Sequence, residues 1–305
     1  MQKRPFVIIV VGLLFVLTLA GCGSTSTPQT SVTPTGNGAT GGTWDKVKAE
    51  ARVIVGIGQE AAPFGFRENG ELVGFDVEIV RAVVKRLETY AGGPIALEFK
   101  AVTDETRISW VQSGEVHMSL AHTNITRKRL DNIDFTVPYG WDGKGILYRT
   151  ADGKRDLADF AGKSIGIKRS SSSEGEIQAY FAAQGWAAPV LKQFDNHAAG
   201  IQALIDEQID GFTDDNSIII NTAVVGGHKV GSDGELVVTD TPYSPAYFGI
   251  GVPQNDSQWR NVLNYSLHDL WSSGEYHTIY NKWFGPDSRC PIPLNNHQME
   301  PFVNG

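Results

Sequence analysis

The sequence predicts an α/β fold divided into two lobes, and three observations lead to this prediction. Short runs rich in Val, Ile and Phe alternate with segments of helical periodicity, which is typical of parallel sheets flanked by helices. The 305 residues are enough for two such lobes. Extended segments near residues 140–148 and 245–252 would carry the chain from one lobe to the other and back. We therefore expect a two-strand hinge and a ligand cleft between the lobes.

The N-terminus resembles the export signal of a lipoprotein. A basic start at residues 2–4 precedes an apolar run at residues 6–20, which is too short to be a good membrane span. Leu19-Ala20-Gly21-Cys22 resembles a lipobox, so we expect residues 1–21 to be removed and Cys22 to carry diacylglycerol. The alternative is an ordinary secretory signal that contains a cysteine by chance.

A spacer follows the predicted lipid anchor. Residues 22–43 consist almost wholly of Gly, Ser, Thr and Pro after the cysteine, which is typical of a flexible linker. We expect the folded part to begin near Trp44. These features predict an extracytoplasmic protein that is tethered to a membrane through Cys22.

Composition limits the classes of function. Hydrophobic residues make up 41% and charged residues 20%, as in ordinary globular proteins. A net charge of -8 argues against a nucleic acid partner. Of the two cysteines, Cys290 lies in a Pro-rich tail, and we interpret it as an incidental thiol. The chain has no metal-ligand spacing, nucleophile elbow or phosphate loop, so we expect neither a cofactor nor catalysis.

The first lobe is predicted from hydrophobic patterns. Asp76 is a plausible N-cap for a helix whose Val77, Val80, Val84 and Leu87 share one face. Another helix is expected over residues 106–113, ending before Gly114. The predicted strands cover residues 52–58, 95–102 and 116–120.

The second lobe shows the same alternation. Ser171 with Glu174, or Ser173 with Glu176, fits a capping box that would open a helix through Phe181. A further helix is expected over residues 199–205, and one terminal helix over residues 270–283. The predicted strands cover residues 145–148, 164–167, 211–213 and, returning to the first lobe, 247–252.

A basic motif carries the functional prediction. Asn124 to Arg129, Asn-Ile-Thr-Arg-Lys-Arg, is followed by Ile133 to Tyr139, Ile-Asp-Phe-Thr-Val-Pro-Tyr. A guanidinium group is planar, always charged and matches a carboxylate with two hydrogen bonds. Taken alone, the triplet could be a solvated basic run. The whole stretch, however, resembles the polar amino acid family of extracellular solute-binding proteins, which feed ABC importers, and in that family the last arginine, here Arg129, clamps the ligand α-carboxylate.

This resemblance extends over nearly all of residues 44–287 and implies a fold. The expected architecture is the type II periplasmic-binding-protein-like fold, or Venus flytrap, with a two-strand hinge. Lobe 1 would comprise residues 44–141 and 246–289, and lobe 2 residues 142–245. Residues 290–305 would form a C-terminal tail.

The resemblance also supplies an anion for the ligand ammonium. Asp210 to Asp215, Asp-Gly-Phe-Thr-Asp-Asp, is similar to the family pattern Asp-Ala-x-x-x-Asp, whose final aspartate, here Asp215, takes the ammonium. Asp210 would then be structural. The alternative from the residues alone is that Asp214 and Asp215 cap a helix that begins at Asn216.

Other ligand contacts follow from the same comparison. Backbone amides at Ser171 and Ser172 would meet the carboxylate at a helix N-terminus, although these serines could simply cap the helix. Arg107 and His197 match positions that reach the ligand side chain from opposite lobes. The full candidate set is Arg129, Asp215, Asn124, Thr126, His122, Ser171, Ser172, Arg107, His197 and Phe64.

Departures from the family pattern narrow the ligand. Gly58 stands where the glutamate/aspartate branch has an arginine, and Ala61 and Asp104 replace aromatic residues of the basic-amino-acid binders. We therefore expect glutamate, glutamine or aspartate, in that order. The predicted protein is a monomer that binds the amino acid, closes and docks on an ABC permease with its ATPase. The alternatives are an enzyme on this scaffold, resembling cyclohexadienyl dehydratase, and an amino-acid-sensing module.

Overall fold

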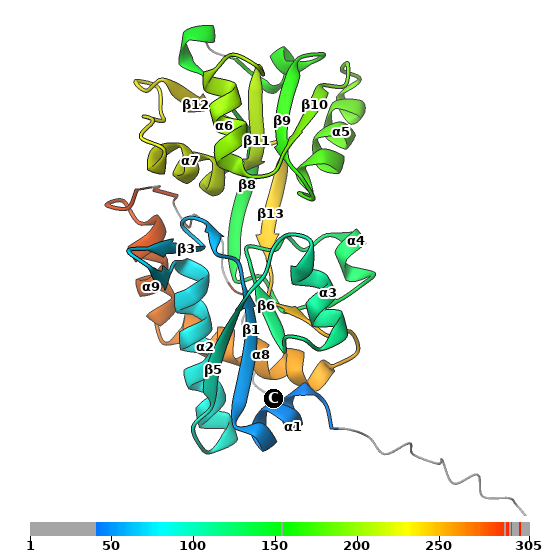
Figure 1. Ribbon diagram of the computed structural model, residues 1–305, viewed down its shortest axis with the longest axis vertical. Helices are drawn as coiled ribbons and strands as arrows, with labels where there is room; N and C mark the ends of the chain where they lie inside the picture. Colours follow the sequence, from blue (N-terminus) through cyan, green and yellow to red (C-terminus); the bar gives the residue numbers. More distant parts are fainter. Residues whose placement is uncertain (1–40, 154, 290, 293, 295–298, 300–305) are drawn as a thin grey trace, which may run out of the picture. The chain divides into compact units, whose positions relative to one another are not determined.

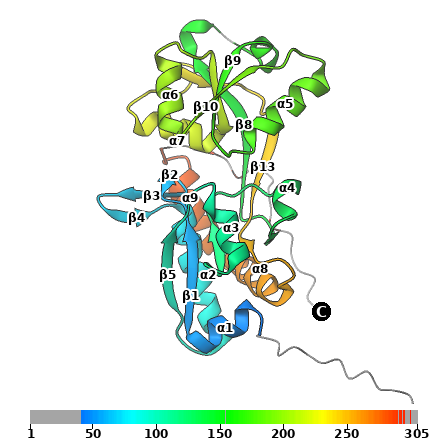
Figure 2. The ribbon, with the colours of Figure 1, turned by 45° about the vertical axis from the view of Figure 1, so that its right-hand side comes forward.

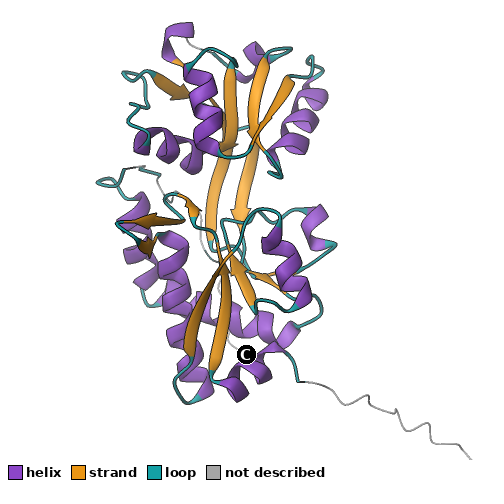
Figure 3. Cartoon of the chain, viewed as in Figure 1, coloured by secondary structure: helices purple, strands orange, loops and turns teal. Residues whose placement is uncertain are grey.

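The computed structural model describes residues 41–153, 155–289, 291–292, 294 and 299. The predicted signal peptide, the predicted lipidation site Cys22, most of the linker, Cys290 and most of the C-terminal tail lie outside the described residues. The described chain contains two main sheets flanked by helices, which confirms the predicted α/β class (Figure 1, Figure 3).

The first sheet has the strand order β5-β1-β6-β14-β7. Strands β5 and β6 pair with β1 in parallel, whereas β14 pairs antiparallel with β6 and β7 because the chain returns to this sheet from the second lobe. The sheet is thus only partly parallel, unlike the prediction. Its strands are β1 (Arg52–Ile57), β5 (Ala96–Ala101), β6 (Met118–Leu120), β7 (Asp134–Phe135) and β14 (Gly251–Val252).

Six described helices accompany the first sheet: α1 (Thr43–Glu50), α2 (Phe75–Ala91), α3 (Thr106–Ser113), the short α4 (Arg127–Leu130), α8 (Ser257–Ser272) and α9 (Glu275–Phe284). The predicted apolar face of α2 is buried. Its N-cap is Gly74, so the prediction that Asp76 caps this helix is wrong. The carboxylate of Asp76 instead accepts hydrogen bonds from the His122 N–H and the Tyr139 hydroxyl, both at 2.8 Å.

The C-terminal helical region differs from the prediction of one terminal helix. It consists of α8 and α9, which are separated at Ser273 and Gly274. Gly274 has a φ of 79°, a left-handed conformation that glycine adopts without steric cost. Trp259 of α8 stacks on Trp44 of α1 with ring centroids 6.0 Å apart, so these helices share one core with the sheet.

A short hairpin sheet lies beside the first lobe's main sheet. It contains β2 (Glu60–Ala61), β3 (Gly65–Glu68) and β4 (Glu71–Val73), three short strands that the sequence does not predict. The segment between β2 and β3 places Phe64 in the core.

The second sheet has the strand order β10-β9-β11-β8-β12, with β13 also paired to β8. Helices α5 (Ser173–Gln184), α6 (His197–Ile205) and α7 (Asn216–Val225) flank it (Figure 2). Its strands are β8 (Gly140–Arg149), β9 (Ser164–Lys168), β10 (Val190–Phe194), β11 (Gly211–Asp215), β12 (Leu236–Val238) and β13 (Ser244–Phe248).

Two antiparallel strands connect the sheets. β8 and β13 pair from Gly140 opposite Phe248 to Lys144 opposite Ser244, and β8 then continues beside β11. Below, the first lobe denotes the sheet that contains β1 with its helices, and the second lobe denotes the sheet that contains β9 with its helices.

Candidate functional site

A polar pocket brings together side chains from both lobes. The first lobe supplies residues of α3, of the segment after β6 and of α4 (Arg127–Leu130), and the second supplies the starts of α5 and α6 and the end of β11. The pocket has a volume of about 10 Å³, so groups on its walls lie close enough to bond across it. Its lining residues are Asp104, Arg107, His122, Asn124, Arg129, Ser171, Ser172, His197, Asp214 and Asp215.

Arg129 is less exposed than its basic neighbours Arg127 and Lys128. Its side chain lines the pocket and donates from Nη1 to the carbonyl of Asn124 at 2.8 Å, whereas Arg127 and Lys128 are exposed. Thr126 is the N-cap of α4, and its hydroxyl accepts a hydrogen bond from the Arg129 N–H at 3.3 Å. Burial lowers the pKa of Arg129 to about 10, so it stays a cation at neutral pH. The solvated-run interpretation therefore holds for Arg127 and Lys128 only.

Asp215 faces the pocket as the anion. It is the N-cap residue of α7, yet its side chain makes no capping hydrogen bond. Its carboxylate instead accepts from Nδ2 of Asn124 at 3.0 and 3.3 Å, which disfavours the alternative of a simple helix cap. Burial raises the pKa of Asp215 to about 7, and the nearby charge of Asp214 adds to this rise.

Lys144 is a central member of the site that the sequence analysis missed. It lies on β8 with its side chain fully buried, and its ammonium is 3.6 Å from Asp214 and 3.5 Å from Asp215. It also donates to the hydroxyls of Ser172 and Ser173, both at 2.9 Å. Burial alone would lower the pKa of Lys144, but the two aspartates raise it above its ordinary range. A strand residue flanked by glycines gave no signal of this role.

Asp214 bonds to several polar side chains of the second lobe. Its carboxylate lies 2.9 Å from Nε2 of His197 and accepts from the hydroxyls of Ser171 and Ser173 at 3.2 and 3.0 Å. Burial raises the pKa of Asp214, but Lys144 and His197 outweigh that effect and hold it well below its usual range. Asp214 therefore stays ionised and orients His197 at the pocket wall.

The start of α5 differs from the predicted capping box. The helix begins at Ser173, its N-cap is Ser172, and no side-chain hydrogen bond caps it there. The Ser171 hydroxyl accepts from the Ser173 N–H at 3.2 Å, and Glu176 lies 3.9 Å from Lys144. Both Ser171 and Ser172 still line the polar pocket, as expected.

A chain of ion pairs crosses between the lobes at the other side of the pocket. Arg107 on α3 lies 2.8 Å from Asp104, and Lys168 of β9 lies 2.5 Å from the same carboxylate. Although burial acts in the opposite direction, the two cations lower the pKa of Asp104 to about 2. Arg107 also donates to the carbonyl of Ala121 at 2.8 Å, so its orientation is fixed by the first lobe.

His122 has an uncommon backbone conformation. Its φ is 40°, a region that few residues other than glycine adopt, and its side chain lines the pocket. The imidazole packs on the ring of Phe64 with centroids 5.5 Å apart. Burial and the charge of Arg107 lower the pKa of His122 well below its usual range, so the ring is neutral.

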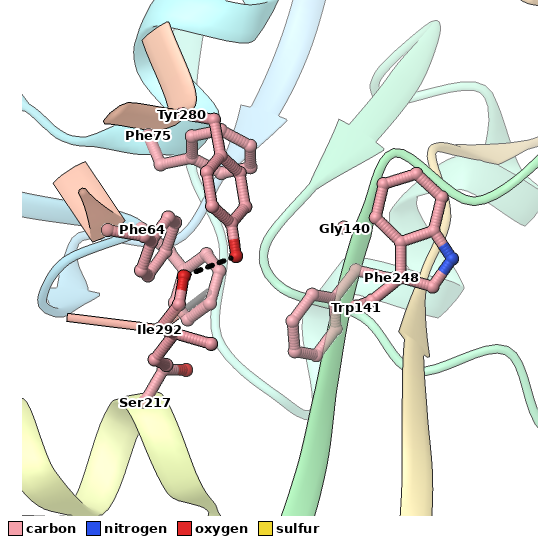
Figure 4. Close-up of a pocket in the computed structure, with 9 residues that line it drawn as sticks. Phe64, Phe75, Gly140, Trp141, Ser217, Phe248, Tyr280 and Ile292 are labelled. Atoms are coloured by element: carbon pink, nitrogen blue, oxygen red, sulfur yellow. Dashed lines mark hydrogen bonds between the residues drawn. The ribbon is translucent and has the colours of Figure 1, made fainter. Parts of the chain in front are cut away.

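Phe64 does not line the polar pocket. Together with Phe75 and Phe248 it lines a separate apolar pocket (Figure 4). There the Tyr280 hydroxyl donates to the carbonyl of Ile292 at 3.1 Å. Phe64 contacts the ring of His122, which lines the polar pocket, and Thr126 bonds to the backbone of Arg129, which also lines it.

Three buried polar atoms at the pocket make no hydrogen bond with any described residue: Nε of Arg107, Nδ1 of His122 and Oδ1 of Asn124. The first is a donor, the third an acceptor, and the imidazole nitrogen takes either role with its tautomer. Buried polar groups normally have partners. Together these atoms can both donate to and accept from a small polar molecule.

The described residues contain neither a candidate membrane span nor a candidate metal site. Among them, we find no helix with the length and apolar character needed to cross a membrane. The same residues hold no cluster of His, Cys, Asp and Glu that could bind a metal ion.

The fold and the charged interlobe pocket define a binding protein. Residues 53–286 match the bacterial extracellular solute-binding proteins, family 3, and the chain belongs to this family. It is a solute-binding protein and not an enzyme. The predicted two-lobed type II fold is likewise confirmed by similar solved structures.

Curated relatives come from several bacteria. The chain is 27% identical to the ABC transporter glutamine-binding protein GlnH of Bacillus subtilis, over 94% of this chain and 99% of the relative. It is 25% identical to the L-glutamate/L-aspartate-binding protein of Pseudomonas aeruginosa, over 83% and 82% of the two chains. An ancestral arginine-binding protein bound to arginine has a TM-score of 0.66 at 29% identity, over 77% of this chain and 99% of that one.

Proposed function

We propose that this protein is the lipid-anchored, substrate-binding component of an ABC importer and that it binds a polar amino acid, with glutamate, glutamine or aspartate favoured. The names of its relatives in Bacillus subtilis and Pseudomonas aeruginosa support amino acid transport. The bound ligand would be delivered to a permease with its ATPase. The protein would act as a monomer outside the cytoplasm.

One observation carries the proposal: a half-buried arginine and a buried aspartate face one small pocket from different lobes. Arg129 comes from α4 of the first lobe and Asp215 from β11 of the second. An amino acid zwitterion requires one cation and one anion, and a guanidinium binds a carboxylate with two hydrogen bonds. The unpartnered Oδ1 of Asn124 offers the ammonium a second acceptor.

The ligand side chain would lie between Arg107 and His197. Arg107 keeps an unpartnered Nε donor although it pairs with Asp104, and the ring of His197 is held by Asp214. Asp104 and Asp214 hold these two donor side chains in place, and such donors suit an amide or carboxylate oxygen of the ligand. Because the two side chains come from different lobes, a ligand that reaches both would stabilise the closed state.

Isothermal titration calorimetry of the full chain in detergent with each of the twenty amino acids tests the proposal. We expect saturable binding of glutamate, glutamine or aspartate, and mass spectrometry should recover the ligand unaltered. Tight binding of arginine with no binding of these three would contradict the assignment. Chemical conversion of the ligand would favour an enzyme on this scaffold.

A further inference from the structure

A second, larger cavity adjoins the polar pocket. It has a volume of about 270 Å³ and lies between the hairpin segment that follows β1 and the start of α3. We call it the outer cavity. His122 and Asp104 are the two described residues that line both the outer cavity and the polar pocket. These two side chains therefore form the wall between a very small space and a much larger one.

Both residues of the wall are held by contacts with their neighbours. The Asp104 carboxylate is held on both sides, by Arg107 at 2.8 Å and by Lys168 at 2.5 Å. The His122 ring packs against Phe64 on one side, and a Cβ added to Gly58 would come within 4.0 Å of its Cε1. That distance is an ordinary van der Waals contact, so Gly58 lies directly beside the imidazole.

The backbone of His122 indicates that its side chain has a function at this position. A φ of 40° is adopted most easily by glycine, and histidine is among the few residues that tolerate it. Such conformations cluster at binding sites, where the surrounding structure maintains them. The His122 N–H is anchored by Asp76 at 2.8 Å, and Nδ1 makes no hydrogen bond with any described residue. A glycine would keep the backbone contact and lose only the ring.

The outer cavity favours a cation, whereas the end of the polar pocket between Arg107 and His197 favours an anion or an oxygen acceptor. Four carboxylates, those of Glu60, Asp104, Glu105 and Asp195, line it together with one ammonium, that of Lys168. Glu60, Glu105 and Asp195 are exposed, so they attract a cation without being fully desolvated. A long cationic side chain that passed the wall would meet favourable charges.

We propose that His122 is a specificity-determining residue, a partition that stops the ligand side chain inside the polar pocket and excludes long cationic amino acids. This inference rests on the proposed function, because it assumes that an amino acid binds between Arg129 and Asp215. It assigns the ligands to polar amino acids no longer than glutamate or glutamine. Arginine and lysine are excluded by the imidazole, although the charges beyond it would favour them.

The test compares His122→Gly with the wild-type full chain by calorimetry, using glutamine, glutamate and arginine. We expect arginine affinity to rise by at least about tenfold, an easily measured change. Glutamine and glutamate affinity should change less than arginine affinity does. His122→Asn, which also tolerates positive φ, should give a smaller gain and supplies a second measurement if the glycine variant does not fold.

Asn69→Gly is the matched control. Asn69 also has a positive φ, 52°, but it is exposed in the turn between β3 and β4. This variant relaxes the backbone in the same way without opening the wall, so its ligand preference should equal that of the wild type.

The outcomes separate the two proposals. If the wild type binds glutamine or glutamate and neither His122 variant gains arginine affinity, the partition is wrong while the proposed function stands. If the wild type already binds arginine as tightly as glutamine, the partition is overturned as well. If no polar amino acid binds the wild type, the proposed function itself fails, and the partition fails with it.

Discussion

Asn124 and Asp215 bond to each other across the two lobes: Nδ2 of the amide lies 3.0 and 3.3 Å from the two carboxylate oxygens. The sequence predicts that both residues contact the ligand. An incoming ammonium would therefore share or replace the Asn124 contact, while the unpartnered Oδ1 of the same amide becomes a second acceptor. The Asn124 amide thus holds the Asp215 carboxylate beside the expected position of the ligand ammonium.

Arg129→Ala is expected to abolish measurable amino acid binding and leave the fold intact. Removing one member of a desolvated charge pair costs roughly 2–5 kcal/mol, which corresponds to about 30-fold to several-thousand-fold in affinity. Calorimetry measures the loss. Arg127→Ala, an exposed arginine on the same helix, is the control and should bind normally. Near wild-type affinity of Arg129→Ala would remove this residue from the site.

Ligand affinity should depend on pH through Asp215. Its pKa is raised to about 7, mainly by burial, and the ammonium needs the ionised form. Affinity should therefore fall by up to about tenfold per pH unit below about pH 7 and level off above it, since one proton is exchanged. Titrations at several pH values measure this slope. An affinity that stays constant down to about pH 5 would show that another group receives the ammonium.

The same raised pKa predicts the effect of Asp215→Asn on stability. The folded chain holds this proton more tightly than the unfolded chain, whose aspartate has an ordinary pKa of 3.8. The proton on Asp215 therefore stabilises the folded chain fully below pH 3.8, and this stabilisation is lost as the pH rises through about 7. Asp215→Asn should raise the melting temperature at about pH 8 more than at about pH 4, while it weakens ligand binding. Equal effects at both pH values would contradict this account.

Lys144→Met should destabilise the protein. The substitution removes the cation that lies 3.6 and 3.5 Å from Asp214 and Asp215, and it leaves two buried carboxylates side by side. Breaking such a buried cluster typically costs about 3–5 kcal/mol. Chemical denaturation measures the change, with the exposed Lys163→Met as control. A free energy of unfolding equal to that of the control would show that Lys144 is dispensable.

Arg107→Ala should weaken glutamate binding more than serine binding. Only the longer ligand uses a donor at the far end of the pocket. The ratio of the two affinities is the informative quantity, because damage to the Asp104 and Ala121 contacts would lower both affinities alike. An unchanged ratio would assign Arg107 to the fold or to the common zwitterion.

Cys22→Ser should release the protein from membranes. The lipobox-like sequence before Cys22 predicts that lipid is attached to this sulfur. Cell fractionation followed by immunoblotting measures the distribution. If the variant stays in the membrane fraction, an uncleaved leader or a protein partner provides the attachment instead.

Local patterns in the sequence predicted much of the fold. The face of α2 that carries Val77, Val80, Val84 and Leu87 is buried as expected, because four apolar residues at helical spacing define one stripe. The split between α8 and α9 was missed because a single left-handed glycine interrupts an otherwise continuous helical pattern. Helix α1 was missed because its short sequence lies next to a linker of low complexity.

The motif residues Arg129 and Asp215 line one pocket, and their contacts with a ligand stay a prediction. Lys144 was not predictable, since its burial depends on Asp214 and Asp215, which lie about seventy residues further along the chain and reach it only through the β8–β11 pairing. Charge pairs formed by long-range strand pairing leave no local signal.

The pairing of β8 with β13 and β11 has a consequence for the alignment of the hinge. Successive side chains of a strand point to opposite faces, so a slip of one residue would turn Lys144 away from both aspartates. The same slip would turn Asp142 away from Ser217. The Asp142 carboxylate accepts hydrogen bonds from the N–H and the hydroxyl of Ser217, at 2.9 and 2.5 Å. The buried charges thus penalise a one-residue slip of the hinge strands, so they fix the alignment of the connection between the lobes.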